Sequence, residues 1–319
     1  MLKDCLIAGG IAFIVSLCLG PVVIPMLRRL KIGQTVRDDG PETHLKKSGT
    51  PTMGGVIFLA GIVAAALPFA DDYPGIVPVL FLSFAFGVIG FIDDFIKVVL
   101  KRSKGLAAWQ KLSLQILVTA GFAYYLHISE VTHQVRIPFT NLLADPGILG
   151  LPILFFVVLG TDTGTNFTDG LDGLASSVTT VVALFFAAAS FVLKGDGTAA
   201  PLAAAVAGGL IAFLFFNAYP AKVFMGDTGA LALGGFVSGM AYLMHLQLYI
   251  PIFGVIYLAE VVSVILQVSY FKLSGGKRIF RMAPIHHHFE KGGYSEVRIV
   301  ILFTLVTVIM SLFSLGGIL

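Results

Sequence analysis

The sequence predicts an all-α polytopic membrane protein with about ten transmembrane helices, and both its composition and the length of its apolar runs support that class. Of its 319 residues, 57% are hydrophobic and only 12% are charged, with a mean hydropathy of +0.92. Because soluble domains carry about 25% charged residues, this chain has half the usual means of covering itself with polar surface. Roughly 20 apolar residues suffice for one helix to cross a bilayer, and such stretches recur along the whole chain.

Each predicted span is an apolar run long enough, or nearly long enough, to cross the bilayer as a helix. Before the first span only Lys3 precedes the apolar core, and Arg28, Arg29 and Lys31 follow it, which indicates a retained span and not a cleaved leader. The fifth span is short, and the ninth follows the eighth almost without a loop. In chain order the spans are Cys5–Leu27, Gly54–Ala70, Gly75–Ile92, Leu112–Ile128, Ile148–Gly160, Leu174–Leu193, Ala199–Phe216, Ala230–Leu248, Ile250–Phe271 and Val297–Leu315.

The basic residues predict how these spans are oriented. Counted over alternate loops, 18 of the 21 Lys and Arg fall on one side, and only Lys3, Arg136 and Lys194 fall on the other. The positive-inside rule places the basic side in the cytoplasm, so both termini are expected outside. No internal repeat or linker divides the chain, so residues 1–319 are expected to form one integral membrane domain.

Acidic side chains are costly at membrane depth, so their positions carry information about function. On the predicted topology only Glu260 lies near the middle of the membrane. The aspartates of interest fall at cytoplasmic helix ends and none of them at an external end: Asp93, Asp94, Asp162, Asp169, Asp172 and Asp227.

The first acidic segment, Gly90–Lys97, closes the third span with the adjacent carboxylates Asp93 and Asp94. Two such groups at a helix C-terminus are disfavoured by each other and by the negative end of the helix dipole. A bound cation would offset that cost. A solvated helix end is the plain structural alternative.

The second acidic segment, Asn166–Leu174, places Asp169 and Asp172 three residues apart beside glycines that allow close backbone approach. It lacks the alternating oxygens of an EF-hand loop. Capping of a helix N-terminus is the simpler explanation for the same carboxylates.

The third segment, Asn217–Gly229, carries Phe224, on which a base or ribose could stack, and Asp227, which could bind a cation; an ordinary turn is the alternative. All three segments share one predicted membrane face, where converging carboxylates would repel one another. Oxygen ligands without cysteine favour a hard cation, and phosphate chemistry favours Mg²⁺. Nearby basic residues could bind phosphates, although positive-inside charge accounts for most of them: Lys46, Lys47, Lys97, Lys101, Arg102, Lys104, Lys277, Arg278 and Arg281.

Three consecutive histidines, His286–His288, stand within the segment Arg281–Glu290. Imidazoles are good donors to phosphate or to a peptide carboxylate, and this interpretation is preferred over a structural turn. A zinc site is disfavoured because the chain has no HExxH or Cys–His companion. No G-x-x-x-x-G-K-[ST] run exists either, so a bound nucleotide is expected to be a substrate.

At these segments the chain closely resembles the phospho-N-acetylmuramoyl-pentapeptide transferase family, a branch of the polyprenyl-phosphate N-acetylhexosamine-1-phosphate transferases. The acidic segments are shared with the wider superfamily, whereas the runs Thr-Pro-Thr-Met-Gly-Gly and Pro-Ile-His-His-His-Phe point to the muramoyl branch. The resemblance covers nearly the whole chain and rests on Lys47–Gly55, Asp93–Asp94, Asn166–Leu174, Asn217–Gly229 and Pro284–Phe289.

The resemblance implies an enzyme of the bacterial inner (plasma) membrane that uses Mg²⁺, UDP-MurNAc-pentapeptide and undecaprenyl phosphate to make lipid I and UMP in peptidoglycan biosynthesis. It implies catalytic roles for Asp93, Asp94 and Asp227, with Asp227 as the metal ligand and Asp93 as the candidate base on the lipid phosphate. The implied uridine pocket holds Asn166, Gly170, Leu171, Asp172 and Phe224, with Asp169 beside it. The remaining polar site is expected to contain Lys47, Thr52, Lys97, Asn217, Gln267, His286, His287 and His288.

One departure from the family pattern is visible, and several alternatives stay open. The family commonly has Asn-Ala-Val-Asn-Leu where this chain has Thr163–Phe167, which casts doubt on any contact of the family's first Asn at Thr163. UDP-GlcNAc as the sugar donor, or an ion-coupled transporter, would be competing functions. Direct attack and a covalent phospho-aspartate are competing mechanisms. The oligomeric state is open, with a homodimer as one alternative, and no nucleic-acid partner is expected.

Overall fold

The computed structural model describes residues 1–29, 47, 49–100, 105–129, 134–140, 142–193 and 199–319, and helices dominate this part of the chain. Four of the basic loop residues singled out in the sequence, Lys46, Lys101, Arg102 and Lys104, lie outside it. The long helices are α1 (Leu2–Arg29), α3 (Gly55–Ala66), α4 (Ile76–Val98), α5 (Ala108–Ile128), α6 (Gly150–Thr168), α7 (Leu174–Leu193), α8 (Ala200–Asn217), α9 (Gly226–Leu243), α11 (Val255–Leu273) and α13 (Glu296–Gly316).

Shorter elements connect these helices. The 3-10 turns η1 (Leu67–Phe69), η2 (Gly147–Leu149) and η3 (Gln247–Tyr249) precede or follow long helices, and α10 (Ile250–Phe253) and α12 (Ile285–Glu290) are short α-helices. The strands β1 (Val135–Arg136) and β2 (Leu143–Ala144) pair antiparallel, with Val135 opposite Ala144.

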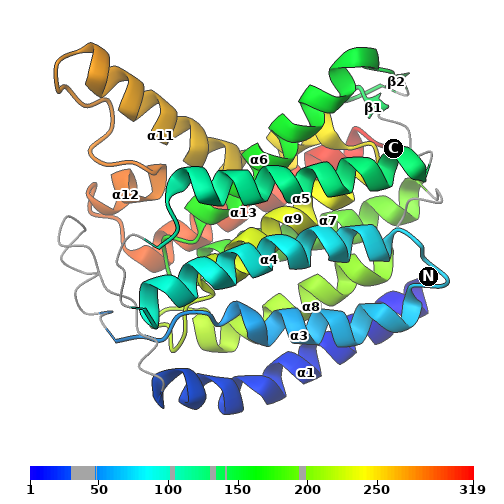
Figure 1. The fold of residues 1–319 in the computed structure, drawn as a ribbon, viewed down its shortest axis with the longest axis horizontal. Helices are drawn as coiled ribbons and strands as arrows, with labels where there is room; N and C mark the ends of the chain where they lie inside the picture. Colours follow the sequence, from blue (N-terminus) through cyan, green and yellow to red (C-terminus); the bar gives the residue numbers. More distant parts are fainter. Residues whose placement is uncertain (30–46, 48, 101–104, 130–133, 141, 194–198) are drawn as a thin grey trace.

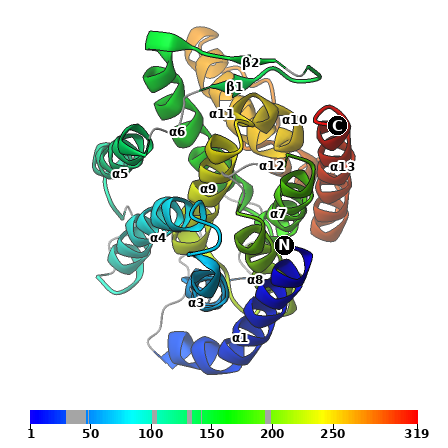
Figure 2. The same ribbon diagram turned by 90° about the vertical axis from the view of Figure 1, so that its right-hand side faces the viewer.

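Helix α9 forms the centre of the bundle and packs against α4, α6, α3 and α7 (Figure 2). Nearly every one of its residues is buried, as expected for a helix that is apolar or small on all sides. Small residues let neighbouring backbones come close: a Cβ at Gly235 would lie 2.7 Å from the carbonyl oxygen of Leu82 on α4. Helix α1 packs on the outside against α8 and α3.

Seven helices of the described residues are long and apolar enough to cross a membrane, so the chain is a mostly helical, multi-pass membrane protein. They are α1, α4, α6 with its preceding turn, α7, α8, α11 and α13. Helix α3 is too short to be counted among them. Helices α5 and α9 are long enough, but they contain more polar residues or glycine and are less apolar. The ten long helices match the ten predicted spans in position, while the number of membrane crossings stays a prediction.

Several predicted spans end too early on the side of the membrane where the charged residues lie. Helix α4 continues past Asp93, α5 begins before Lys111, α6 continues past Asp162, and α9 begins before Asp227. Hydropathy detects the length of chain suited to hydrocarbon, whereas backbone hydrogen bonding continues the helix into the polar zone. The ninth predicted span is also divided, because α10 and α11 meet at Gly254.

Both chain termini lie at one end of the bundle, and α12 with the C-terminal end of α4 lies at the opposite end (Figure 1). Helices α6 and α11 diverge from the rest of the bundle in the same view. The acidic residues of α4, α6 and α9 therefore gather away from the termini.

Candidate active site

Asp94, near the end of α4, caps the N-terminus of α9. Its Oδ2 accepts hydrogen bonds from the backbone N–H of Thr228 (2.9 Å) and from the Thr228 hydroxyl (2.7 Å), and its Oδ1 accepts one from the N–H of Asp227 (3.3 Å). A helix N-terminus presents unpaired N–H groups and partial positive charge, so a carboxylate is stabilised there. Asp94 is buried, and it fixes the start of α9 and thereby the position of Asp227.

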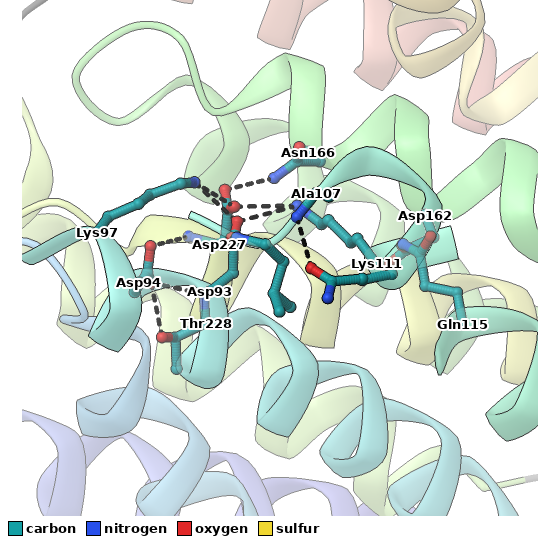
Figure 3. A network of polar contacts seen from close by, with 12 residues as sticks. Asp93, Asp94, Lys97, Ala107, Lys111, Gln115, Asp162, Asn166, Asp227 and Thr228 are labelled. Carbon is teal, nitrogen blue, oxygen red and sulfur yellow. Dashed lines mark hydrogen bonds and ion pairs between the residues drawn. The ribbon is translucent and has the colours of Figure 1, made fainter. Parts of the chain in front are cut away.

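Asp93 of α4 and Asp227 of α9 face each other with two lysines between them (Figure 3). The Nζ of Lys97 lies 2.8 Å from an Oδ2 atom of each carboxylate. The Nζ of Lys111, from α5, lies 2.9 Å from Asp227 Oδ2 and 3.7 Å from Asp93 Oδ2. The side-chain amide of Asn166, from α6, donates to Asp227 Oδ1 at 2.9 Å. Helices α4, α5, α6 and α9 thus converge on the Asp227 carboxylate.

Two glycines allow this convergence. Gly90 of α4 packs so closely on the backbone of α9 that a Cβ there would collide with the carbonyl group of Asp227. Gly226 has a positive φ of 69°, which glycine adopts without strain. A Cβ on Gly226 would lie 2.5 Å from Asp94 Oδ2 and 2.6 Å from Thr52 Oγ1. Thr52 is buried and lies at the edge of the acidic cluster.

The cluster suits a magnesium ion in its donor chemistry. Among the described side chains, Asp93 and Asp227 face the ammonium groups of Lys97 and Lys111, and Asp94 lies beside them on the N-terminus of α9. Among the described residues, no group of three or more His, Cys, Asp or Glu side chains is arranged so that it could hold a metal ion by itself. Mg²⁺ is usually held by one or two carboxylates plus substrate phosphates, so the residues fit an ion that arrives with a phosphorylated substrate.

A second polar cluster joins the 169–173 turn to α13. The Nζ of Lys47 lies 2.6 Å from both Asp172 Oδ1 and Glu296 Oε1. Glu296 also accepts the backbone N–H of Asp172 (2.5 Å), and Asp172 Oδ2 accepts the N–H of Ala221 (2.8 Å). Burial lowers the pKa of Lys47, but its hydrogen bonds to Asp172 and Glu296 outweigh burial and leave that pKa above its usual range. Lys47 therefore stays charged at neutral pH.

The 169–173 turn lies between the two clusters. Asp169 is half-buried, and burial together with the negative charges of Asp227 and Asp94 raises its pKa well above the usual range. Gly170 contacts the imidazole of His286 so closely that a Cβ would collide with its Nε2. Leu171 is buried in the core. The turn is therefore held from both sides, by packing and by the salt bridge of Asp172.

The loop between α8 and α9 is shaped by Asn217. Its side-chain amide donates to the carbonyl of Val223 (3.0 Å) and its Oδ1 accepts a hydrogen bond from Ser176 of α7 (2.8 Å). Phe224, on the same loop, has Lys47 Nζ 6.0 Å from its ring centroid. The structure thus brings Phe224 beside the Lys47 cluster, and Asn217 holds the loop that presents it.

Gln267 and the histidine run lie around α12. Gln267 bonds to backbone groups of Ile279 and Phe280, and His288 Nδ1 accepts the N–H of Arg281 (3.1 Å). His287 Nδ1 lies 2.6 Å from Glu290, and His286 Nδ1 lies 3.0 Å from Glu260 of α11. These contacts fold the α11–α12 connection. Of this group, His286 is placed directly against Gly170 of the 169–173 turn.

Sequence reasoning missed the parts played by four residues. In the sequence Lys111 contributes only to the positive-inside charge, and no motif contains Glu296. Gln115 of α5 belongs to none of the motifs, although its amide donates to the buried Asp162 at 2.5 Å. The sequence distinguishes Glu260 only by its predicted depth in the membrane. A polar residue inside an otherwise apolar helix was the signal available for Gln115, Lys111 and Glu260.

The Lys47 cluster supports a first prediction, on stability. Lys47→Met leaves Asp172 and Glu296 as close, unpaired carboxylates and is expected to cost about 3 kcal/mol of unfolding free energy. Glu296→Gln keeps Lys47 paired with Asp172 and should cost about 1–2 kcal/mol. Urea unfolding in detergent measures both, with Lys222→Met on the exposed part of the α8–α9 loop as the control. Equal stability of Lys47→Met and this control would contradict the pairing.

Residues 76–245 of this membrane-embedded chain match the model of glycosyl transferase family 4, so the chain is a glycosyl transferase of that class. Residues 47–59, which include Lys47 and Thr52, match the phospho-N-acetylmuramoyl-pentapeptide-transferase signature 1.

Curated relatives of that name extend over almost the whole chain. The proteins from Clostridioides difficile and Acetivibrio thermocellus are 48% and 50% identical, covering 96% and 94% of this chain and 95% and 91% of their own lengths. The Clostridium novyi protein is 47% identical over 95% of this chain and 93% of its own length. The chain belongs to the phospho-N-acetylmuramoyl-pentapeptide-transferase family.

Proposed function

We propose that this protein transfers phospho-MurNAc-pentapeptide from UDP-MurNAc-pentapeptide to undecaprenyl phosphate, giving lipid I and UMP in peptidoglycan biosynthesis. The observation that carries the proposal is the meeting of Asp93, Asp94 and Asp227 with Lys97 and Lys111 in a chain of this family. Phosphoryl transfer requires chiefly positioning and charge stabilisation. A cluster of fixed carboxylates and ammonium groups provides both.

The proposed setting is the plasma membrane of a bacterium, with ten crossings, both termini outside and the site on the cytoplasmic face. In support, 18 of the 21 Lys and Arg belong to the predicted cytoplasmic side, and the termini share one end of the bundle (Figure 1). A lipid phosphate lies at the headgroup plane while a nucleotide sugar arrives from water, so helix ends are where both can meet. The homodimer stays a prediction.

We assign the uridine part of the donor to the residues of the 169–173 turn and to Phe224. The Phe224 ring offers a stacking face, and Lys47 beside it offers a charged donor to the diphosphate. Asp172 is an acceptor for polar groups of the nucleoside, and it is already held by Lys47 and Ala221. Asn166 connects the turn to Asp227, because its backbone carbonyl accepts the N–H of Asp169 and its side-chain amide donates to Asp227.

Asp227, with Asp93 and Asp94 beside it, would hold the Mg²⁺ ion. When bound, the ion neutralises diphosphate charge and favours departure of UMP. Lys97 and Lys111 belong to the same reaction centre, because their ammonium groups already lie on the Asp227 carboxylate. They are placed to pair with phosphate oxygens once the donor enters. Gln267, His287 and His288 would contact the rest of the donor from the α11–α12 connection.

Asp93 is the proposed base. Its Oδ1 is held by the N–H of Leu106 (2.6 Å) while its Oδ2 faces Lys97, so one oxygen is anchored and the other points to the cluster. In direct attack, Asp93 takes a proton from the lipid phosphate, whose oxygen attacks the β-phosphorus of the donor as UMP leaves. In double displacement the carboxylate itself attacks the β-phosphorus and UMP leaves, and the lipid phosphate then attacks the phosphorus of this aspartyl ester and releases the carboxylate. Both mechanisms use Oδ2 of Asp93, so replacing Asp93 would not distinguish them. A phosphorylated enzyme that can be trapped is expected only for double displacement.

The test of the function is UMP release by the purified protein with UDP-MurNAc-pentapeptide, undecaprenyl phosphate and Mg²⁺. The expected result is UMP and lipid I in equal amounts, dependent on both substrates and abolished by a chelator of divalent ions. Preference for UDP-GlcNAc in the same assay would reassign the sugar. Donor accumulation in proteoliposomes without UMP would favour a transporter.

A further inference from the structure

Glu260 and His286 form a buried pair that the proposed chemistry does not use. Glu260 is 0% exposed and His286 is 1% exposed. His286 Nδ1 lies 3.0 Å from Glu260 Oε2, within hydrogen-bonding distance. Among the described residues, neither Glu260 Oε1 nor His286 Nε2 has a hydrogen-bond partner. Buried polar atoms nearly always have a hydrogen-bond partner, so two such atoms without a partner in neighbouring side chains require an explanation.

The imidazole is placed between α11 and the 169–173 turn. Its Nδ1 edge faces Glu260, and its Nε2 edge lies against Gly170, where a Cβ would collide with Nε2 and Cε1. With the carboxylate as acceptor, Nδ1 carries the hydrogen, and this fixes the orientation of the ring. Glu260 therefore acts on the turn through His286, although it does not touch the turn itself.

A purely structural role does not account for this pair. If the two helices needed only to be joined, an apolar pair of similar volume would serve as well or better than a buried carboxylate with an imidazole. The nearby Ser263 of α11 illustrates the difference, because among the described residues its hydroxyl bonds only to the backbone carbonyl of Glu260 (2.8 Å). The polar pair is placed where it can set the position of Gly170, and with it Asp169 and Asp172 on either side.

We propose that Glu260 is a positioning residue for donor binding: it holds His286 so that the imidazole supports Gly170 and keeps Asp169 and Asp172 in place for the uridine diphosphate part of the donor. The proposal rests on the proposed function, because it takes the 169–173 turn as part of the donor site. A change at Glu260 should therefore alter the affinity for the donor and leave the chemical step unchanged, because neither Glu260 nor His286 belongs to the Asp93–Asp227 cluster.

The test compares Glu260→Leu, which keeps the volume and removes the acceptor, with Glu260→Gln, which keeps an acceptor oxygen. For Glu260→Leu the KM for UDP-MurNAc-pentapeptide should rise about ten-fold, the effect of losing one hydrogen bond to a charged group, with kcat little changed. Glu260→Gln should lie nearer the wild type. Ser263→Ala, one turn away on α11, is the matched control and should keep the wild-type KM.

Two further variants keep the test decisive if Glu260→Leu folds poorly. Gly170→Ala intrudes on the imidazole from the opposite side without touching Glu260, and it should raise the same KM. Combining Glu260→Leu with His286→Phe should be no worse than His286→Phe alone, because Glu260 acts through the imidazole.

An unchanged KM in Glu260→Leu or in Gly170→Ala, a Glu260→Gln variant no better than Glu260→Leu, or additive losses in the double variant would each overturn the proposal. A wild-type protein that releases no UMP would instead refute the proposed function, so the two failures are distinguishable.

Discussion

Asp227→Asn is expected to reduce turnover by about 10²–10³-fold while the protein remains folded. The substitution keeps the shape of the side chain and its contact with Asn166, but it removes the charge on which Lys97 and Lys111 both lie. The two ammonium groups then share Asp93 alone, and the proposed metal ligand is lost. The effect should appear in kcat together with a weaker response to Mg²⁺.

UMP release measured over a series of Mg²⁺ concentrations tests this prediction. The control is Asp145→Asn, because Asp145 is exposed and its side chain accepts the backbone N–H of Gly147 in the same turn. That variant should match the wild type in both activity and Mg²⁺ response. If Asp227→Asn kept wild-type turnover at every Mg²⁺ concentration, Asp227 would be neither a metal ligand nor part of the reaction centre.

The sequence was sufficient for the class of fold because composition and hydropathy respond to the solvent of the protein, and the lipid solvent requires helices. It also predicted which acidic segments share one end of the bundle. The match between the ten long helices and the ten apolar runs follows from that same constraint. It could not give the true ends of α4, α5, α6 and α9, because hydropathy stops at the first charged residue while the helix does not.

The details of the site depend on contacts between distant segments, which no local pattern encodes. Lys111 becomes a partner of Asp227 only because α5 packs beside α4. Asp94 and Asp93 look alike as adjacent carboxylates, yet one caps α9 and the other faces Lys97. A rotation of about 100° per residue along a helix separates their directions. Only the packed structure assigns them different contacts.

Gly90→Ala is expected to inactivate the protein even though residue 90 has no functional group. A Cβ at this position would collide with the carbonyl group of Asp227 and lie 2.6 Å from the N–H nitrogen of Thr228, both of which are backbone. Backbone cannot move aside like the end of a flexible side chain, so α4 and α9 must separate. Overpacking of this kind costs about 1–3 kcal/mol of unfolding free energy, and it displaces Asp94 from the N-terminus of α9.

The measurement is UMP release alongside urea unfolding in detergent, with Gly160→Ala as the matched control. Gly160 is also in a long apolar helix, but nothing lies within 4 Å of a Cβ built there. Alanine is the better helix former by about 1 kcal/mol, so Gly160→Ala should be as stable as the wild type or slightly more, and fully active. Loss of activity in Gly90→Ala beyond its loss of folded protein would mean that the spacing of α4 and α9 sets the distance between Asp93 and Asp227. Wild-type activity and stability in Gly90→Ala would mean that the two helices do not need this close approach to form the site.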